Sequence, residues 1–283
     1  MISESSHIQI GKISLHRIVM HPDKSVETHS ACIFTHGQGD YAERYLDVLH
    51  PFTNLGIRCI VTDLQGHGRS SGKRGHIASS SFIDAVTESN LQATSGLPTG
   101  IAGHSMGGLL TLRHLALGLT GTLPLPEFCW VNAPLLHPRG NRPDWYVRMA
   151  TLLANIAPAA TIHTGVTPEM CRLEDPARLP KDPLSLGHRR VSIGWGSELL
   201  KIERFTHTTL TQKKYDKPFL YTQGGNDSVC PAIEAQDFFQ QLPFSKKQFN
   251  LFPEMLHETF AEAGREQLFQ VLSSWLEENS LQQ

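Results

Sequence analysis

The chain has 283 residues, 40% of them hydrophobic, and its 25 basic residues nearly balance its 27 acidic ones. This content is ample for one large core, while a formal net charge of −2 gives no support for binding nucleic acid. The polar N-terminal segment lacks the apolar stretch of a signal peptide, and no run of about 20 apolar residues occurs anywhere. We therefore expect a cytoplasmic protein without a transmembrane segment, and the sequence carries no signal for its oligomeric state.

Apolar and polar residues alternate between residues 6 and 20, which predicts a β-hairpin at the start of a sheet. After the hairpin, short continuous apolar runs alternate with segments of helical periodicity. Such runs suit strands buried on both faces, so the alternation predicts the α/β class, with a mainly parallel sheet and helices on both of its faces. The expected strands cover residues 31–35, 57–62, 100–103, 128–132, 218–223 and 248–252, and the expected helices cover residues 80–94, 106–118, 232–241 and 265–278.

The alternation of strands and helices stops for about seventy residues in the second half of the chain, where no strand is predicted. Residues 144–156 and 189–202 have helical periodicity, and Pro- and Gly-rich turns separate them. We expect this part to be an insertion that sits over the sheet as a mainly helical cap. The cap would comprise residues 134–210, and the core residues 1–133 and 211–283.

The sharpest motif is Gly103-His104-Ser105-Met106-Gly107, which directly follows an expected strand and directly precedes an expected helix. The two glycines permit a sharp turn, because side chains at these positions would collide with neighbouring elements. Such a turn holds the serine oxygen above the sheet, at the positive end of a helix. The motif therefore predicts that Ser105 is a nucleophile, against the alternative of a tight turn without chemistry.

A serine hydroxyl needs a base at neutral pH, and after a turn of this kind the acid and then the histidine follow along the chain. The only histidine after residue 227 is His257, which follows the last expected strand. Asp227 follows the strand at 218–223 through a glycine turn, so we predict His257 as the base and Asp227 as the acid. The less favoured carboxylates are Asp216, Asp237, Asp144, Asp175 and Asp182, while Asp63, which precedes the serine, is assigned a structural role.

A negatively charged reaction intermediate on the serine needs backbone N–H donors. Met106, directly after the serine, is the first predicted donor. Gln38 is the second, because it lies in the run His36-Gly37-Gln38-Gly39 that follows an expected strand. An ordinary β-turn is the alternative interpretation of these glycines.

The cysteines and histidines do not indicate a metal or a cofactor. The five cysteines are scattered and odd in number, so we expect them to be reduced and structural. None of the fifteen histidines forms a metal-ligand motif. We therefore predict no metal and no cofactor.

An ordered series of motifs across residues 30–275 resembles the monoglyceride lipase and lysophospholipase group of α/β-hydrolases. The resemblance implies the α/β-hydrolase fold, the triad Ser105, Asp227 and His257, oxyanion donors at Gln38 and Met106, and a cap that binds an acyl chain. The motifs are HGQGDYAERY (36–45), TDLQGHGRSSGKRGHI (62–77), AGHSMGG (102–108), NAPLL (132–136), KDPLS (181–185), GGNDSVC (224–230) and MLHE (255–258).

These observations predict a serine hydrolase that cleaves single-chain lipid esters, most of all a monoacylglycerol, through an acyl-enzyme. A lysophospholipid, a short-chain ester or an N-terminal peptide bond is the alternative substrate on the same triad, and a non-catalytic small-molecule binder is the alternative of a different class. The sequence also leaves open a transient contact between the cap and a membrane surface.

The cap segment 144–156 carries more apolar side chains than a helix needs to rest on a sheet. We expect one part to pack downward and the rest to line an acyl tunnel. Arg139, Arg142 and Arg148 lie nearby, either as solvated surface charges, the simpler interpretation, or in contact with a polar or anionic head group. The apolar side chains are those of Trp145, Val147, Met149, Leu152, Leu153 and Ile156.

Overall fold

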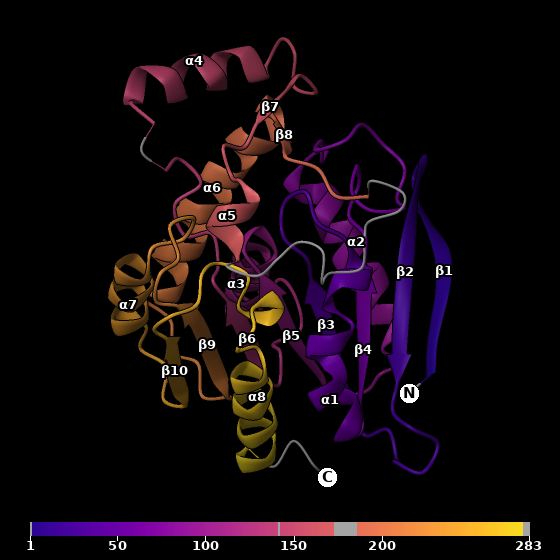
Figure 1. Cartoon of the computed structure of the whole chain (residues 1–283). Helices are drawn as coiled ribbons and strands as arrows, with labels where there is room; N and C mark the ends of the chain where they lie inside the picture. Colours follow the sequence, from indigo (N-terminus) through magenta and orange to yellow (C-terminus); the bar gives the residue numbers. More distant parts are fainter. Residues whose placement is uncertain (1, 141, 173–185, 280–283) are drawn as a thin grey trace.

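The computed structural model describes residues 2–140, 142–172 and 186–279. Within these residues a central sheet of eight strands runs through the molecule (Figure 1). The strands are β1 (Ile2–Ile10), β2 (Ile13–His21), β3 (Ser30–Thr35), β4 (Ile57–Thr62), β5 (Thr99–His104), β6 (Cys129–Asn132), β9 (Phe219–Gly224) and β10 (Lys247–Phe252). Their order is β1-β2-β4-β3-β5-β6-β9-β10, in which β2 pairs antiparallel with β1 and β4 and all later pairs are parallel.

Helices cover both faces of this sheet. α1 (His50–Asn54) and α8 (Glu266–Glu278) pack on one face, around the buried rings of Phe128 and Trp130. α2 (Ser80–Ala93), α3 (Met106–Leu119) and α7 (Ala232–Gln241) pack on the other. The predicted α/β class, with its N-terminal hairpin and mainly parallel sheet, is confirmed. Short 3₁₀ turns are η1 (Ala42–Tyr45), η2 (Asp47–Leu49) and η4 (Thr259–Ala261).

The insertion contains two short strands that the sequence pattern did not reveal. β7 (Thr161–His163) and β8 (Arg190–Ser192) form an antiparallel pair beside α5 (Pro168–Cys171), below α4 (Asp144–Ala154) in Figure 1. The expectation that no strand lies between residues 134 and 210 was therefore wrong, because strands of three residues are too short to show a periodicity. The second expected helix, 189–202, is α6 (Ile193–Leu210), which begins later and continues further.

We propose that residues 134–210 form a cap, as the sequence predicts, with α6 as its base. Trp195 and Leu199 of α6 are buried against α2 and α3, and the Trp195 indole N–H donates to the Met106 sulfur at 3.2 Å. α4 has no buried residue and stands above the rest of the molecule (Figure 1). The cap is thus anchored at α6 and exposed at α4, while its motif KDPLS (181–185) lies outside the described residues.

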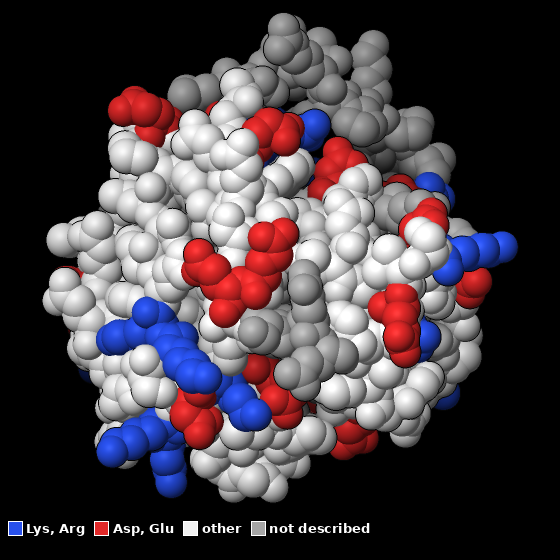
Figure 2. Space-filling view, turned by 90° about the horizontal axis from the view of Figure 1, so that it is seen from below, with Lys and Arg blue, Asp and Glu red and all other residues white. Residues whose placement is uncertain are grey.

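The two ends of the molecule differ in surface chemistry. Around α4, Trp145 is 67% exposed and Ile156 is 82% exposed. On the opposite face, acidic and basic side chains stand side by side, and neither sign covers the face (Figure 2). Across the described ranges no helix combines the length and apolarity needed to cross a bilayer.

Candidate active site

The predicted nucleophile stands at a sharp turn between β5 and α3. Ser105 has φ 55° and ψ −120°, a backbone conformation that L-residues rarely adopt. The turn is possible because Gly103 and Gly107 have no side chains: a Cβ on Gly103 would lie 2.5 Å from the Gly107 carbonyl oxygen, and one on Gly107 would meet the carbonyls of Thr35 and His36. Tight packing of neighbouring backbone therefore maintains the strained serine.

The structure brings the predicted base and acid to this serine. The Ser105 hydroxyl lies 2.9 Å from His257 Nε2, and His257 Nδ1 lies 2.8 Å from Asp227 Oδ2. A carboxylate only accepts hydrogen bonds, so His257 Nδ1 must carry the proton and Nε2 must accept from the serine. His257 and Asp227 are both buried, which shields this chain of hydrogen bonds from bulk water.

Asp227 is fixed by donors that the sequence analysis did not identify. Its Oδ1 accepts from the backbone N–H groups of Val229 and Cys230, each at 2.8 Å. Its Oδ2 accepts from Gln223 Nε2 at 2.9 Å, in addition to the bond from His257. Gln223 lies near the end of β9, four residues before Asp227. This position at the carboxyl end of the strand was the signal from which its contact with Asp227 could have been predicted.

The predicted oxyanion donors are Met106, the residue after the serine, and Gln38, which lines the same cavity as Ser105. Met106 is the first residue of α3, so its N–H has no acceptor within the helix. Two hydrogen bonds hold the loop that carries Gln38. Gln38 Nε2 donates to the carbonyl of Arg190 in β8 at 2.7 Å, and the backbone N–H of His188 donates to the carbonyl of Gly39 at 2.8 Å. The cap therefore fixes the loop, and oxyanion binding remains a prediction for both residues.

His104, predicted only as part of the turn, packs against the base, with ring centroids 4.7 Å apart. The Asn132 carbonyl Oδ1 accepts from the hydroxyls of Thr222 and Thr259, so Asn132 Nδ2 donates to His104 Nδ1 at 2.9 Å. Burial lowers the pKa of His104 well below its usual value. His104 is therefore neutral and adds no positive charge beside His257.

A buried ion cluster joins the loop that carries His257 to the insertion. Glu258, directly after the base, accepts from Arg44 at 2.6 and 3.2 Å and from Arg172 at 2.6 Å. Its backbone N–H donates to the carbonyl of Cys171 in α5. Burial alone would raise the pKa of Glu258, but the neighbouring Arg44 and Arg172 lower it to about 2. Glu258 is thus ionised and links two segments that lie far apart in the chain.

We predict that Glu258→Gln lowers the free energy of unfolding by about 3–5 kcal/mol, because it leaves Arg172 buried without a counter-charge and leaves Arg44 with Asp40 alone. The Glu258 pKa is lower in the folded state than in the unfolded chain, so its contribution is complete above about pH 4.5 and is lost as the pH falls toward 2. Urea unfolding of both proteins from pH 7 to pH 3 measures this. A constant difference below pH 4.5 would contradict the assignment.

Asp63 has the structural role that the sequence suggested. Its carboxylate accepts from the backbone N–H groups of Ala42 at 2.6 Å and Arg69 at 2.8 Å, and it lies 3.2 Å from His16 Nδ1. Burial tends to raise the pKa of Asp63, but the bond to His16 and these donors lower it overall. Asp63 therefore fixes the two loops next to β3 and β4.

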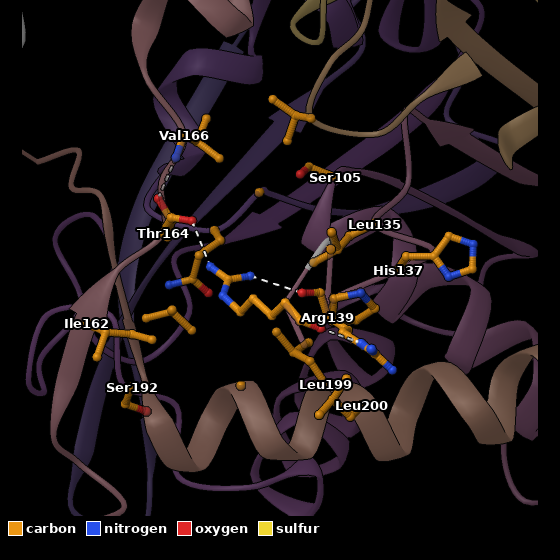
Figure 3. A pocket seen from close by; sticks show the side chains of 18 of the residues that line it. Ser105, Leu135, His137, Arg139, Ile162, Thr164, Val166, Ser192, Leu199 and Leu200 are labelled. Carbon is orange, nitrogen blue, oxygen red and sulfur yellow. Dashed lines mark hydrogen bonds between the residues drawn. The ribbon is translucent and has the colours of Figure 1, made fainter. Parts of the chain in front are cut away.

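A cavity of about 270 Å³ lies over Ser105, between the core and the cap (Figure 3). Ser105, His257 and Gln38 line it from the core side. The cap contributes mostly apolar side chains. Among them are Leu135, Val147, Ala150, Ile162, Val166, Val191, Ile193, Leu199 and Leu200.

In the part of the chain that the structure describes, one group of side chains has the spacing of a metal site: Asp227, Cys230 and His257, with ligand atoms within 4.8 Å of one another. Asp227 and His257 are already bonded to each other. Burial raises the pKa of the Cys230 thiol well above its usual value, which disfavours the thiolate that binds metals. The group is thus explained by the serine-histidine-aspartate arrangement.

A strained serine between a strand and a helix, with a histidine and an aspartate from later strand ends, on a mostly parallel sheet, defines the α/β-hydrolase class. Comparison with known families gives a more specific result. The chain belongs to the family described as serine aminopeptidase, S33, whose model matches residues 26–264. It is therefore a hydrolase, and the predicted resemblance to the monoglyceride lipase group is confirmed.

Curated relatives match most of the chain. A phospholipase of Bacillus subtilis is 27% identical, covering 87% of this chain and 94% of its own. A monoacylglycerol lipase of Mycolicibacterium smegmatis is 24% identical, covering 97% and 96%. An uncharacterized abhydrolase domain-containing protein of Dictyostelium discoideum is 28% identical over 247 residues, which span 26% of its length.

Solved structures share the fold. A soluble variant of the monoglyceride lipase of Saccharomyces cerevisiae, in complex with a substrate analogue, has a TM-score of 0.84 at 19% identity; the match covers 99% of this chain and 96% of that one. The monoacylglycerol lipase of Paleococcus ferrophilus has a TM-score of 0.78 at 24% identity and covers 92% and 99%.

Proposed function

We propose that the protein is a serine carboxylic-ester hydrolase that cleaves single-chain lipid esters, first of all a monoacylglycerol. The observation that carries this proposal is the continuous chain of hydrogen bonds from Ser105 through His257 to Asp227 at the floor of a largely apolar cavity. The triad supports the chemistry, and the cavity supports the apolar substrate. A cytoplasmic location stays a prediction of the sequence.

In the proposed reaction, Ser105 Oγ attacks the ester carbonyl carbon while His257 Nε2 takes the hydroxyl proton. The negative oxygen is stabilised by the N–H groups of Gln38 and Met106. When the carbon–oxygen bond breaks, His257 returns the proton to the leaving alcohol. Water then attacks the acyl-enzyme, giving its proton to His257, and the fatty acid leaves as Ser105 recovers the proton. Asp227 stabilises the protonated imidazole throughout.

Peptide hydrolysis, which the family description mentions, receives less support from the cavity. A free carboxylate would be the strongest partner for the protonated amino group of an aminopeptidase substrate. Among the described residues, Asp40 and Glu258 are the carboxylates that line the cavity. Both are already paired with Arg44, at 2.9 and 2.6 Å. The relatives named as monoacylglycerol lipases and a phospholipase also favour a lipid ester.

The experiment that tests the proposal combines labelling with a substrate screen. A fluorophosphonate should add once to the wild-type protein, as measured by intact mass. Hydrolysis rates are then compared over monoacylglycerols, lysophospholipids, p-nitrophenyl esters and aminoacyl p-nitroanilides. Absence of an adduct would favour the non-catalytic binder, and cleavage of anilides alone would favour the aminopeptidase.

The wall of the cavity gives a prediction about acyl length. An apolar tunnel gains about 0.8 kcal/mol per buried methylene, so each added carbon should raise kcat/KM by up to about fourfold until the tunnel is full. Ala150 lines the cavity from α4, so Ala150→Trp should shift the optimum to shorter chains. The measurement is kcat/KM over a series of monoacylglycerols, and a flat wild-type series would contradict the lipase proposal.

Leu152 supplies the matched control for this series. The expectation that the apolar side chains of segment 144–156 either pack downward or line a tunnel was wrong for Leu152, which is 62% exposed and does not line the cavity. Leu152→Trp should therefore leave the preferred acyl length unchanged. The helix directs Tyr146, Val147 and Ala150 toward the cavity and leaves the side chains of Trp145, Met149, Leu152 and Leu153 exposed.

The exposed apolar side chains of the cap support the proposal of transient contact with a membrane surface. Replacing both Trp145 and Ile156 with serine should weaken binding to phosphatidylcholine vesicles at least about tenfold, because burial of each large apolar side chain contributes up to about 1.5–3 kcal/mol. Vesicle sedimentation measures the bound fraction. Leu125→Ser is the control, since Leu125 is 40% exposed but lies outside the cap. Equal losses in both variants would contradict a specific role of the cap.

A further inference from the structure

Charged side chains are few in the cavity over Ser105, and nearly all of them have a partner. Asp40 and Glu258 are bonded to Arg44, and Arg172 also binds Glu258. His104 is neutral. The other ionisable groups of the wall that have a partner within the described ranges are Arg139 with Asp144, His137 with Glu234, and His257 with Asp227.

The exception is Arg142, which lines the cavity and is half-buried. Its Nη1 donates to the carbonyl of Arg139 and its Nη2 to the carbonyl of Thr164, both at 3.2 Å. Dashed lines reach these two labelled residues in Figure 3. Neither carbonyl carries a charge, and no carboxylate of residues 2–140, 142–172 or 186–279 forms an ion pair with this guanidinium.

The two carbonyls position the guanidinium without neutralising it. A guanidinium has five N–H donors, so these two bonds leave three for a ligand. A positive charge beside apolar groups costs free energy until an anion compensates it. Carboxylates and phosphates match the flat, forked geometry of arginine. Arg142 therefore offers the cavity an unused anion-binding group.

We propose that the cavity also accepts esters that carry an anionic oxygen group, a phosphate or a carboxylate, and that Arg142 binds this group. The inference rests on the proposed ester hydrolysis at Ser105 and adds a class of substrates to it. The anion has two sources. A phosphate would belong to the alcohol side, as in an acylglycerol phosphate, whereas a terminal carboxylate would belong to the acyl side, as in a glycerol half-ester of a dicarboxylic acid.

The test compares kcat/KM for monomeric octanoyl esters, used below the concentration at which they form micelles. The phosphate arm divides the value for octanoylglycerol phosphate by that for octanoylglycerol. The carboxylate arm divides the value for a glycerol half-ester of octanedioic acid by the same reference. Arg142→Gln should lower the ratio in at least one arm by about 10- to 100-fold, the size of a hydrogen bond to a charged group. The arm that responds identifies the source of the anion.

Arg148→Gln is the matched control, because Arg148 is an exposed arginine of α4 that does not line the cavity. It should leave both ratios unchanged, and Arg142→Lys should restore part of the loss. Unchanged ratios in Arg142→Gln, or equal falls in Arg148→Gln, would overturn the inference even while octanoylglycerol is hydrolysed. Failure of the proposed function is recognised separately, as hydrolysis that survives the removal of the Ser105 hydroxyl.

Discussion

Replacing Ser105 with alanine is expected to abolish fluorophosphonate labelling and to lower kcat by about 10⁶, the loss found when a serine nucleophile is removed from a comparable triad. The hydroxyl that His257 Nε2 contacts at 2.9 Å would be gone, and no other group at the turn replaces it. The fold should persist, because the substitution removes one hydrogen bond, worth about 1 kcal/mol. Intact mass after labelling and a thermal melt measure the two effects.

Ser105→Gly is the control that separates chemistry from backbone strain. The positive φ of 55° is strained for serine and alanine but open to glycine. The glycine variant should therefore be as inactive as the alanine variant, yet melt at a higher temperature. Labelling that survives in either variant would refute the assignment of Ser105 as the nucleophile.

Asp227→Asn should lower kcat by up to about 10⁴, the loss found in a serine protease. The backbone donors at Val229 and Cys230 would hold the amide oxygen in the place of Oδ1. The amide nitrogen would then face His257 Nδ1, which must turn into an acceptor, and the proton would move to Nε2. An imidazole protonated at Nε2 cannot accept the proton of Ser105. Steady-state rates at neutral pH measure the loss.

Two other aspartates provide the comparison. Asp216 precedes β9, and Asp237 lies in α7. The same change to asparagine at either position should leave kcat within a few-fold of the wild-type value. A loss below tenfold at Asp227, together with a severe loss at Asp216 or Asp237, would move the acid to the other position.

Much of the fold could be predicted because the strands are buried on both faces. β6 and β9 are buried at every residue, so they appear in the sequence as continuous apolar runs, and the expected boundaries lie within one residue of the observed ones. The turn at Ser105 was recognisable because its two glycines and the serine form a short motif directly between an expected strand and an expected helix, although the carbonyls that Gly107 approaches belong to Thr35 and His36. A local sequence pattern thus predicted both features.

The features that were missed depend on contacts between distant segments. Glu258 and Arg44 are separated by 214 positions, and no local pattern marks two such residues as partners. The outward direction of Leu152 depends on how α4 packs against α6, which helical periodicity alone does not specify. Gln223 was overlooked for a different reason. A polar side chain near the end of a buried strand indicates that the strand ends there, and nothing in the sequence marks it as a donor to Asp227.

The ion cluster at Glu258 has a consequence for protein engineering. Arg172 comes from the insertion, Arg44 from the turn η1, and Glu258 from the loop that carries the base. A chimaera that receives the insertion of another hydrolase would keep Arg44 and Glu258 but exchange Arg172. The transplanted segment must therefore place a cation of its own beside Glu258, or the loop that carries His257 loses one of the ion pairs that fix it. The insertion of this enzyme is not an interchangeable module.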